Sequence, residues 1–264
     1  MPLLTHGFLG ADAGQARKKI LRKYSQLFAV LRELNDVSHE YLRGLRLDLQ
    51  NEFHIFTVTY FIRGLSTFQS LIILLEHGCI DDARALCRTL LHTHFRLAAI
   101  AAKPSVLNRI RATGISEAKK RLESYKTGQR KIPPGSRSVD LDAQIKAAEV
   151  QLKKLGRSEI TEKQLAEIGG CDYDIQYAVL SDAAHGSLSD LGPSVLKFDR
   201  RRRFLGYVYG PSDKDLATYA VYAADLQRGN LTNTDKTIRH GLPVGFAALQ
   251  ERRIQLRSDM PGIF

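Results

Sequence analysis

The chain has 264 residues, of which 44% are hydrophobic and 25% are charged. This balance is that of a soluble globular protein, and it excludes disordered and collagen-like classes. The net charge of +11 favours an anionic partner such as nucleic acid or a membrane surface. Residues 105–160 contribute +7 of this charge, so the excess of Lys and Arg is concentrated in one middle stretch.

Neither the cysteines nor the N-terminal sequence favours export. Three cysteines without a CxxC pair indicate neither a disulfide framework nor a zinc site of the usual spacing, which fits a reducing cytoplasm. Residues 1–19 carry their positive charges after a weakly apolar stretch, the reverse of a secretory signal. The most apolar segment, Thr57 to Leu75, contains Arg63 and several polar residues. We therefore expect a buried bundle helix there and no membrane contact.

Three long helices are predicted in the first 104 residues. Apolar residues three and four apart form one stripe from about Ala13 to Asn51, where Gly44 weakens the helix but need not end it. A second helix, roughly Phe53 to His77, is apolar on more than one face and is expected at the centre of the bundle. Gly78 suits the left-handed position after its end, and a third helix, Asp81 to about Lys103, returns antiparallel to it.

A polar, basic block follows the third helix. Two helix-compatible stretches, 105–130 and 140–155, are separated by a run rich in Pro and Gly. In the next helix, 158–168, Thr161 and Gln164 make a capping box. Because this block has few apolar residues, we interpret it as an excursion from the core bundle.

Apolar spacing resumes in the last part of the chain. Residues 172–184 predict a helix that the sequence HGSLSDLGP ends. β-branched and aromatic residues on both sides of a charged turn then predict one small β-hairpin near residues 195–209. Two helices, 211–228 and 234–257, complete the chain, the second with a kink at Pro243.

Together these elements predict a mainly α fold, a helical bundle with one small β-hairpin. Residues 1–104 form the N-terminal half of the core and residues 105–170 a basic helical insertion. Residues 171–264 form the C-terminal half of the core with the hairpin, in one continuous domain with residues 1–104. We also expect the protein to self-associate as a homo-oligomer.

Two segments resemble a known family. YFIRGLSTFQSLIILLEHGCIDDARALCRTLLHTHFRL and the later YAVLSDAAHGS are similar to the all-helical "domain of unknown function fifty-six seventy-seven", over 55–100 and 172–228. The positions that match its motifs are Arg63, Glu76, Gly78, Arg84, Arg88, Tyr177, Leu180, Ser181, His185 and Ser187. His92 stands where that family usually has Glu.

The family also resembles the HEPN superfamily, which implies a bacterial or phage defence setting and a metal-independent ribonuclease without a cofactor. HEPN nucleases place a His four to six residues after an Arg, so that both side chains reach one groove between two subunits. Arg88 with His94 or His92 fits this spacing, with His185 as a third candidate catalytic residue. The His would act as acid or base on a ribose hydroxyl while Arg88 steadies the phosphorane. Arg63, Arg84, Tyr177 and Ser181 are the neighbouring candidates for substrate binding.

A purely structural role for the same residues is the alternative interpretation. Arg63, Arg84 and Arg88 would serve the fold alone if they paired with Glu76 and Asp82 inside the bundle. His185 would then cap a helix end.

Other chemistries are disfavoured by the sequence. A Ser181–His185 nucleophilic pair lacks a nucleophile elbow, and a metal held by His92, His94 and His185 lacks a carboxylate or Cys partner. No phosphate-binding glycine loop occurs.

Two basic features could hold phosphates. One is the middle block, and the other is the four-arginine hairpin turn formed by Arg200, Arg201, Arg202 and Arg203. Charge runs are more often solvated surface. We expect a cytoplasmic protein that binds RNA or another nucleic acid and cleaves RNA, with a non-enzymatic regulatory or interaction module as the alternative.

Overall fold

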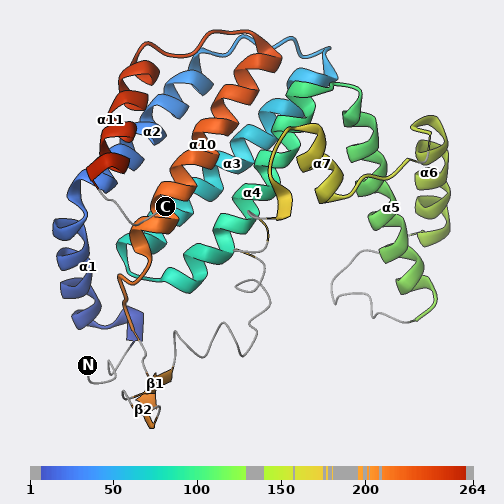
Figure 1. The fold of residues 1–264 in the computed structure, drawn as a ribbon. Coiled ribbons are helices and arrows are strands. Elements are labelled where there is room, and N and C mark those ends of the chain that lie inside the picture. Colours follow the sequence, from blue (N-terminus) through green and yellow to red (C-terminus); the bar gives the residue numbers. More distant parts are fainter. Residues whose placement is uncertain are drawn as a thin grey trace.

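The computed structural model describes residues 7–128, 140–156, 158–174, 177, 180, 196–198, 201, 203–207 and 210–259. They form a helical bundle with one two-stranded antiparallel sheet, which confirms the predicted fold class (Figure 1). The elements are η1 (Gly7–Leu9), α1 (Ala11–Lys23), α2 (Ser25–Gly44), α3 (Glu52–Glu76), α4 (Ile80–Ala102), α5 (Val106–Lys126), α6 (Leu141–Lys154), α7 (Glu162–Ile168), β1 (Leu196–Phe198), β2 (Phe204–Tyr207), α10 (Leu216–Ile238) and α11 (Gly245–Asp259).

The core lies among α2, α3, α4 and α10. Helices α3, α4 and α10 pack against one another, and α2 lies beside α10 and α3 (Figure 1). Their facing sides are made of large apolar side chains that water does not reach, among them Phe28, Leu31, Phe68, Leu71, Leu90 and Phe95. Burial of these faces supplies the main driving force for folding.

Helix α3 is the predicted central helix. It is the one helix of the described residues that is long and apolar enough to cross a membrane, and half of its most apolar stretch is buried in the bundle. Phe61, Phe68, Leu71 and Leu75 are fully buried. A core helix passes this test of length and composition as readily as a membrane span does.

The turn after α3 confirms the role predicted for Gly78. This residue has φ +71°, and the amide of Cys79 returns to the carbonyl of Leu74 at 2.9 Å. A side chain at Gly78 would also meet the backbone of Ser212, whose oxygen lies 2.7 Å from the position of an added Cβ. The chain therefore reverses into α4 at a position that only glycine occupies without strain.

The long first helix was predicted wrongly. The chain bends at Tyr24, so α1 and α2 are separate helices, and α2 ends at Gly44. An added Cβ at Gly44 would lie 3.0 Å from the His240 ring. The low helix propensity of glycine and this close neighbour explain why the helix stops where the apolar spacing continues.

Helix α10 corrects a second prediction. We expected a break between residues 228 and 234, but α10 runs from Leu216 to Ile238. Gly229 lies inside it because the His94 ring packs there, 2.4 Å from the position of an added Cβ. Asn230 and Thr234 continue the buried face, and the chain leaves the helix before Pro243. Tertiary packing thus overrides the local helix-breaking signals.

The middle block projects from the bundle. Helices α5 and α6 pack on each other, and no residue of α6 is buried (Figure 1). The start of α5 still belongs to the core, where Val106, Leu107 and Ile110 are buried. Helix α7 packs on α4 and begins with the predicted capping box of Thr161 and Gln164. The division of the chain into a core and an insertion stays a prediction.

The hairpin is present, with Leu196 opposite Tyr207 in the antiparallel pair. Within the predicted 172–184 helix, the described residues are 172–174, Tyr177 and Leu180.

Candidate functional site

One face of α4 carries the candidate site. Arg88, His92 and Arg96 follow at intervals of four residues, so their side chains lie on the same side of the helix. The opposite side buries Cys87, Leu90 and Leu91, and this fixes the rotation of α4. The exposed side lines a pocket of about 430 Å³ whose walls are Tyr60, Arg63, Ala85, Arg88, Thr89, His92, Thr93 and Arg96. We call it the arginine pocket.

Aromatic stacking orients Arg88. Its guanidinium donates a hydrogen bond to the Tyr177 hydroxyl and lies 4.7 Å from the centre of that ring. Tyr177 stacks on Tyr173, with centroids 4.6 Å apart and planes at 16°, and on His92 at 5.9 Å and 22°. Two predicted site residues that are far apart in sequence, Arg88 and Tyr177, are therefore in contact. Cation–π attraction and the hydrogen bond together restrict the Arg88 side chain.

His92 is kept neutral by its surroundings. Burial, and then the guanidinium groups of Arg96 and Arg88, lower the pKa of His92 from 6.5 to about 4. Its Nδ1 lies 3.8 Å from a Glu162 carboxylate oxygen. The buried Nε2 has no hydrogen-bond partner among the described residues. At neutral pH the imidazole is therefore uncharged, and one of its nitrogens is unused.

Arg96 and Glu162 extend the site in a way the sequence did not predict. Arg96 forms an ion pair with Glu162 and donates to the His92 carbonyl at 3.0 Å, with its guanidinium 6.0 Å from the Tyr60 ring. Burial raises the pKa of the Glu162 carboxyl, although Arg96 acts in the opposite direction. Glu162 thus brings a carboxylate from α7 to a residue, His92, that stands where the resembled family usually has Glu. One feature of the sequence could have placed Arg96 in the site, namely its spacing of four residues from His92 and eight from Arg88.

Glu162 also lines a neighbouring pocket of about 370 Å³. Its walls are Tyr60, Arg96, Ile110, Thr113, Gly114, Glu117, Glu159, Ile160, Thr161, Glu162 and Leu165. We call it the glutamate pocket. It shares Tyr60 and Arg96 with the arginine pocket, so the two adjoin.

His94 does not share the face of Arg88. His94 is six positions after Arg88, and at about 100° per residue this places the two side chains roughly 120° apart around the helix. The His94 ring packs on Gly229 of α10, with Nδ1 3.1 Å from the Asn230 side-chain oxygen. Burial lowers the pKa of His94. The groove shared by Arg88 and His94 that we expected is therefore absent from the described structure, and His92 takes the place of His94 beside Arg88.

The other predicted binding residues are distributed as follows. Arg63 is exposed at the rim of the arginine pocket, and Arg84 is half-buried one turn before Arg88. Arg201 and Arg203 are exposed at the end of the hairpin. His185, Ser181, Arg200 and Arg202 lie outside the described residues.

The buried network has different members from those predicted. Glu76 pairs with Arg17 at 2.5 Å and Arg32 at 2.6 Å, one on each carboxylate oxygen. Burial alone would raise the pKa of the Glu76 carboxyl, but the hydrogen bonds from the two arginines outweigh it, so that this pKa is lowered. Glu76 therefore does not pair with Arg63, Arg84 or Arg88, because α1 and α2 supply its counter-charges.

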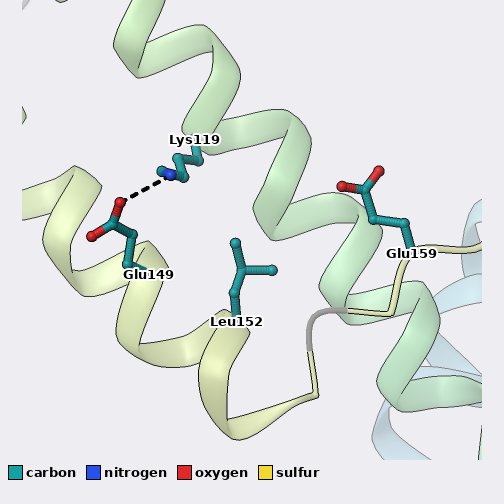
Figure 2. Close-up of a pocket in the computed structure, with 4 residues that line it drawn as sticks. All are labelled: Lys119, Glu149, Leu152 and Glu159. Atoms are coloured by element: carbon teal, nitrogen blue, oxygen red, sulfur yellow. Dashed lines mark ion pairs between the residues drawn. The ribbon is translucent and has the colours of Figure 1, made fainter.

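The lysines of the middle block pair with acids of the same block. Lys119 lies 2.9 Å from Glu149 of α6, across a pocket of about 210 Å³ at the α5–α6 junction (Figure 2). Lys126 pairs with Asp142, and Lys120 lies 3.7 Å from Glu159. These pairs favour the solvated-surface interpretation for this part of the block.

No three His, Cys, Asp or Glu side chains of the described residues lie close enough together to hold a metal ion. His92 and His94 face different sides of α4, so the metal site considered for them would need other ligands.

Comparison with known proteins places the site within one family. A model described as a family of unknown function (DUF5677) matches residues 54–202, more than half of the chain. The match begins where the resemblance was expected, includes the middle block and ends before α10. Neither a search of curated proteins nor a search of solved structures found a match.

Proposed function

The chain belongs to the family of unknown function DUF5677, and from the site itself we propose that it binds RNA, with one phosphate group of the strand in the arginine pocket. The observation that carries the proposal is the lining of that pocket. Three arginines reach it from two helices, and none of the described residues that line it is acidic. Arginine pairs with phosphate oxygens through two parallel hydrogen bonds, which makes such a pocket suited to a phosphodiester.

Arg63 and Arg88 are the phosphate ligands in this proposal. Arg63 is exposed, and its side chain has no hydrogen bond or ion pair with any other described residue, so its charge is available to a ligand. Arg88 is held against Tyr177, and Arg96 is neutralised by Glu162. A ligand with phosphate oxygens would meet one exposed cation, Arg63, and one that is positioned in advance, Arg88.

A nucleic-acid strand fits better than a small anion because aromatic rings adjoin the arginines. Tyr60 lines the pocket, and the Tyr173–Tyr177–His92 stack lies behind Arg88. Single-stranded RNA is commonly bound by stacking unpaired bases on such rings while cations contact its backbone. Arg201 and Arg203, exposed on the hairpin, would add backbone contacts.

Cleavage is a second proposal with its own observation, the neutral ring of His92 beside Arg88. In it, His92 takes the proton of the ribose 2′-hydroxyl, the 2′ oxygen attacks phosphorus, and the bond to the 5′ oxygen breaks. The leaving oxygen takes a proton from water, the hydroxide so formed takes the proton from His92, and the product is a cyclic phosphate. Arg88 stabilises the charge that develops on the phosphorane, so no metal is required. This is the HEPN-like ribonuclease reaction with His92 in place of His94.

Binding is tested by fluorescence anisotropy with labelled single-stranded RNA in EDTA, over a range of salt concentrations. Arg63→Gln should weaken binding severalfold and reduce the slope of log affinity against log salt by about 1. Arg22→Gln, which removes an exposed arginine of α1, is the matched control and should leave both unchanged. Absence of RNA binding, or equal losses in the two variants, would refute the proposal.

Cleavage is tested on the same RNA, end-labelled, in EDTA. His92→Ala should abolish it, and His77→Ala, at the end of α3, should not. If the wild-type protein binds RNA without cutting it, the non-enzymatic module is the correct alternative.

A further inference from the structure

The glutamate pocket has chemistry opposite to that of its neighbour. The arginine pocket presents hydrogen-bond donors, whereas Glu117, Glu159 and Glu162 surround the glutamate pocket. Tyr60 and Arg96 belong to both walls, so one ligand can reach from the first into the second. Such a ligand would have an anionic end and an end rich in N–H groups.

The polar groups that remain open in the glutamate pocket are acceptors. Glu117 is exposed, and its carboxylate has no hydrogen bond or ion pair with another described residue. Glu162 gives Oε1 to Arg96, while its buried Oε2 has no partner among the described residues. Ionised carboxylates only accept hydrogen bonds. A ligand group that donates is therefore favoured, and one that presents lone pairs is repelled.

The threonine hydroxyl groups of the pocket are already used. Thr113 Oγ1 donates to backbone carbonyls and accepts from the Ile160 amide at 2.8 Å, and Thr161 Oγ1 accepts from Gln164 in the capping box. Glu159 accepts from Ser116 at 2.5 Å and lies near Lys120. Of the three carboxylates, this leaves Glu117 and Glu162 to recognise the ligand.

The spacing of the two pockets fits a nucleotide. Arg88 lines only the arginine pocket and Arg96 lines both pockets, and the two are eight residues apart on α4, or roughly 12 Å along the helix axis. A phosphate ion cannot reach both ends of this distance, whereas a phosphate, a sugar and a base together can. The volume of about 370 Å³ is also in the range of pockets that enclose small ligands.

We infer that the glutamate pocket takes the base of the nucleotide whose phosphate occupies the arginine pocket, and that Glu117 and Glu162 select guanine. This inference rests on the proposed function. Guanine is the RNA base that presents two adjacent donors, N1–H and the 2-amino group, on its Watson–Crick edge. Adenine, cytosine and uracil each place at least one acceptor beside their donor, and a carboxylate repels that acceptor.

The experiment is a comparison of nucleoside monophosphates by isothermal titration calorimetry with the full chain. GMP should bind at least tenfold more tightly than AMP. IMP, which lacks only the 2-amino group, should bind severalfold less tightly than GMP. Equal affinities for the three, or inorganic phosphate that competes as well as GMP, would overturn the inference.

Two variants locate the preference. Glu117→Gln should reduce the ratio of GMP to AMP affinity at least fivefold while AMP binding stays within twofold, and because Glu117 is exposed and unpaired among the described residues, folding is not at risk. Glu162→Gln should have the same effect on the ratio. Glu167→Gln, exposed on α7, is the control and should change neither affinity. A preference for GMP that persists in both Glu117→Gln and Glu162→Gln would contradict the inference.

The RNA-binding assay distinguishes a failure of the proposed function from a failure of guanine selection alone. If RNA binds and depends on Arg63 but GMP shows no advantage, the proposed function stands and the base selection is wrong. If RNA does not bind, both fail.

Discussion

The guanidinium of Arg96 is bonded to the carboxylate of Glu162, and this one ion pair joins α4 to α7 at the boundary of the two pockets. About three quarters of each side chain is buried, since 26% of Arg96 and 24% of Glu162 are exposed. Removal of either partner leaves a largely buried charge without its counter-charge. The pair is therefore part of the fold as well as a wall of the site.

Replacement of Arg96 alone should cost more than replacement of both partners. For Arg96→Met we expect a loss of about 2 kcal/mol in the free energy of unfolding at pH 7, less than for a fully buried pair. The double variant Arg96→Met with Glu162→Gln should recover at least half of the loss, because no isolated charge remains. Urea denaturation measures both. A double variant as unstable as the single one would contradict this.

His92 should titrate far below an ordinary histidine. Because burial and the two arginines disfavour the imidazolium, the ring resonances of His92 in an NMR titration should have a midpoint of about pH 4, against an ordinary 6.5. The unfolded chain binds this proton more readily than the folded one, so His92 contributes a loss of stability as pH falls from 6.5 towards 4. A midpoint near 6.5 would show that the ring is solvated. His92→Ala identifies the resonance by its absence.

Glu76 should make stability depend on acid pH. The pKa of Glu76 is lowered below its ordinary 4.5, so its stabilising effect is complete above that value and is lost as pH falls through the folded-state pKa. At pH 7, Glu76→Gln should lower the free energy of unfolding by about 1–3 kcal/mol, because two charged hydrogen bonds are weakened. The difference from wild type should shrink below pH 4.5.

The control for Glu76 is Glu40→Gln, which neutralises an exposed carboxylate of α2. It should change stability little at either pH. A Glu76→Gln effect of the same size at pH 3 and pH 7 would mean that packing, and not charge, explains the loss.

Gly78→Ala should be strongly destabilising. The added methyl group meets the Ser212 backbone in a left-handed conformation of φ +71°. We expect a loss of at least about 2 kcal/mol in the free energy of unfolding. Gly14→Ala is the matched control, because Gly14 is inside α1 with no atom within 4 Å of an added Cβ, and it should gain about 0.5–1 kcal/mol. Equal thermal unfolding of the two variants would contradict the turn geometry.

The sequence predicted best what depends on local patterns. The bounds of α3 and α4, the left-handed Gly78, the capping box at Thr161 and the hairpin each follow from residues close to one another in the chain. The interruption expected near Gly229 failed because a ring from another helix fills the space beside the glycine. Such a contact leaves no mark in the residues around position 229.

The candidate site was likewise predictable only where its residues lie on one helix. A spacing of four residues was enough to bring Arg88 and His92 together, and the helical period of 3.6 residues could have excluded His94 from the same face. Tyr60 and Glu162 were missed because they come from other helices, at positions that local patterns do not relate to α4.

Helix α10 has a consequence for how the protein is made. It covers α4 and α3 with a buried face that includes Leu216, Ala220 and Leu231, yet it is translated long after both. Until α10 leaves the ribosome, the nascent chain exposes the apolar surface of α4 and the ring of His94, which α10 covers at Gly229 in the folded protein. Closure over so long a separation is slow and favours aggregation in the interval. Synthesis that stops at residue 202, the last position of the family match, would release a polypeptide without α10, in which the apolar faces of α3 and α4 that α10 buries are exposed to water.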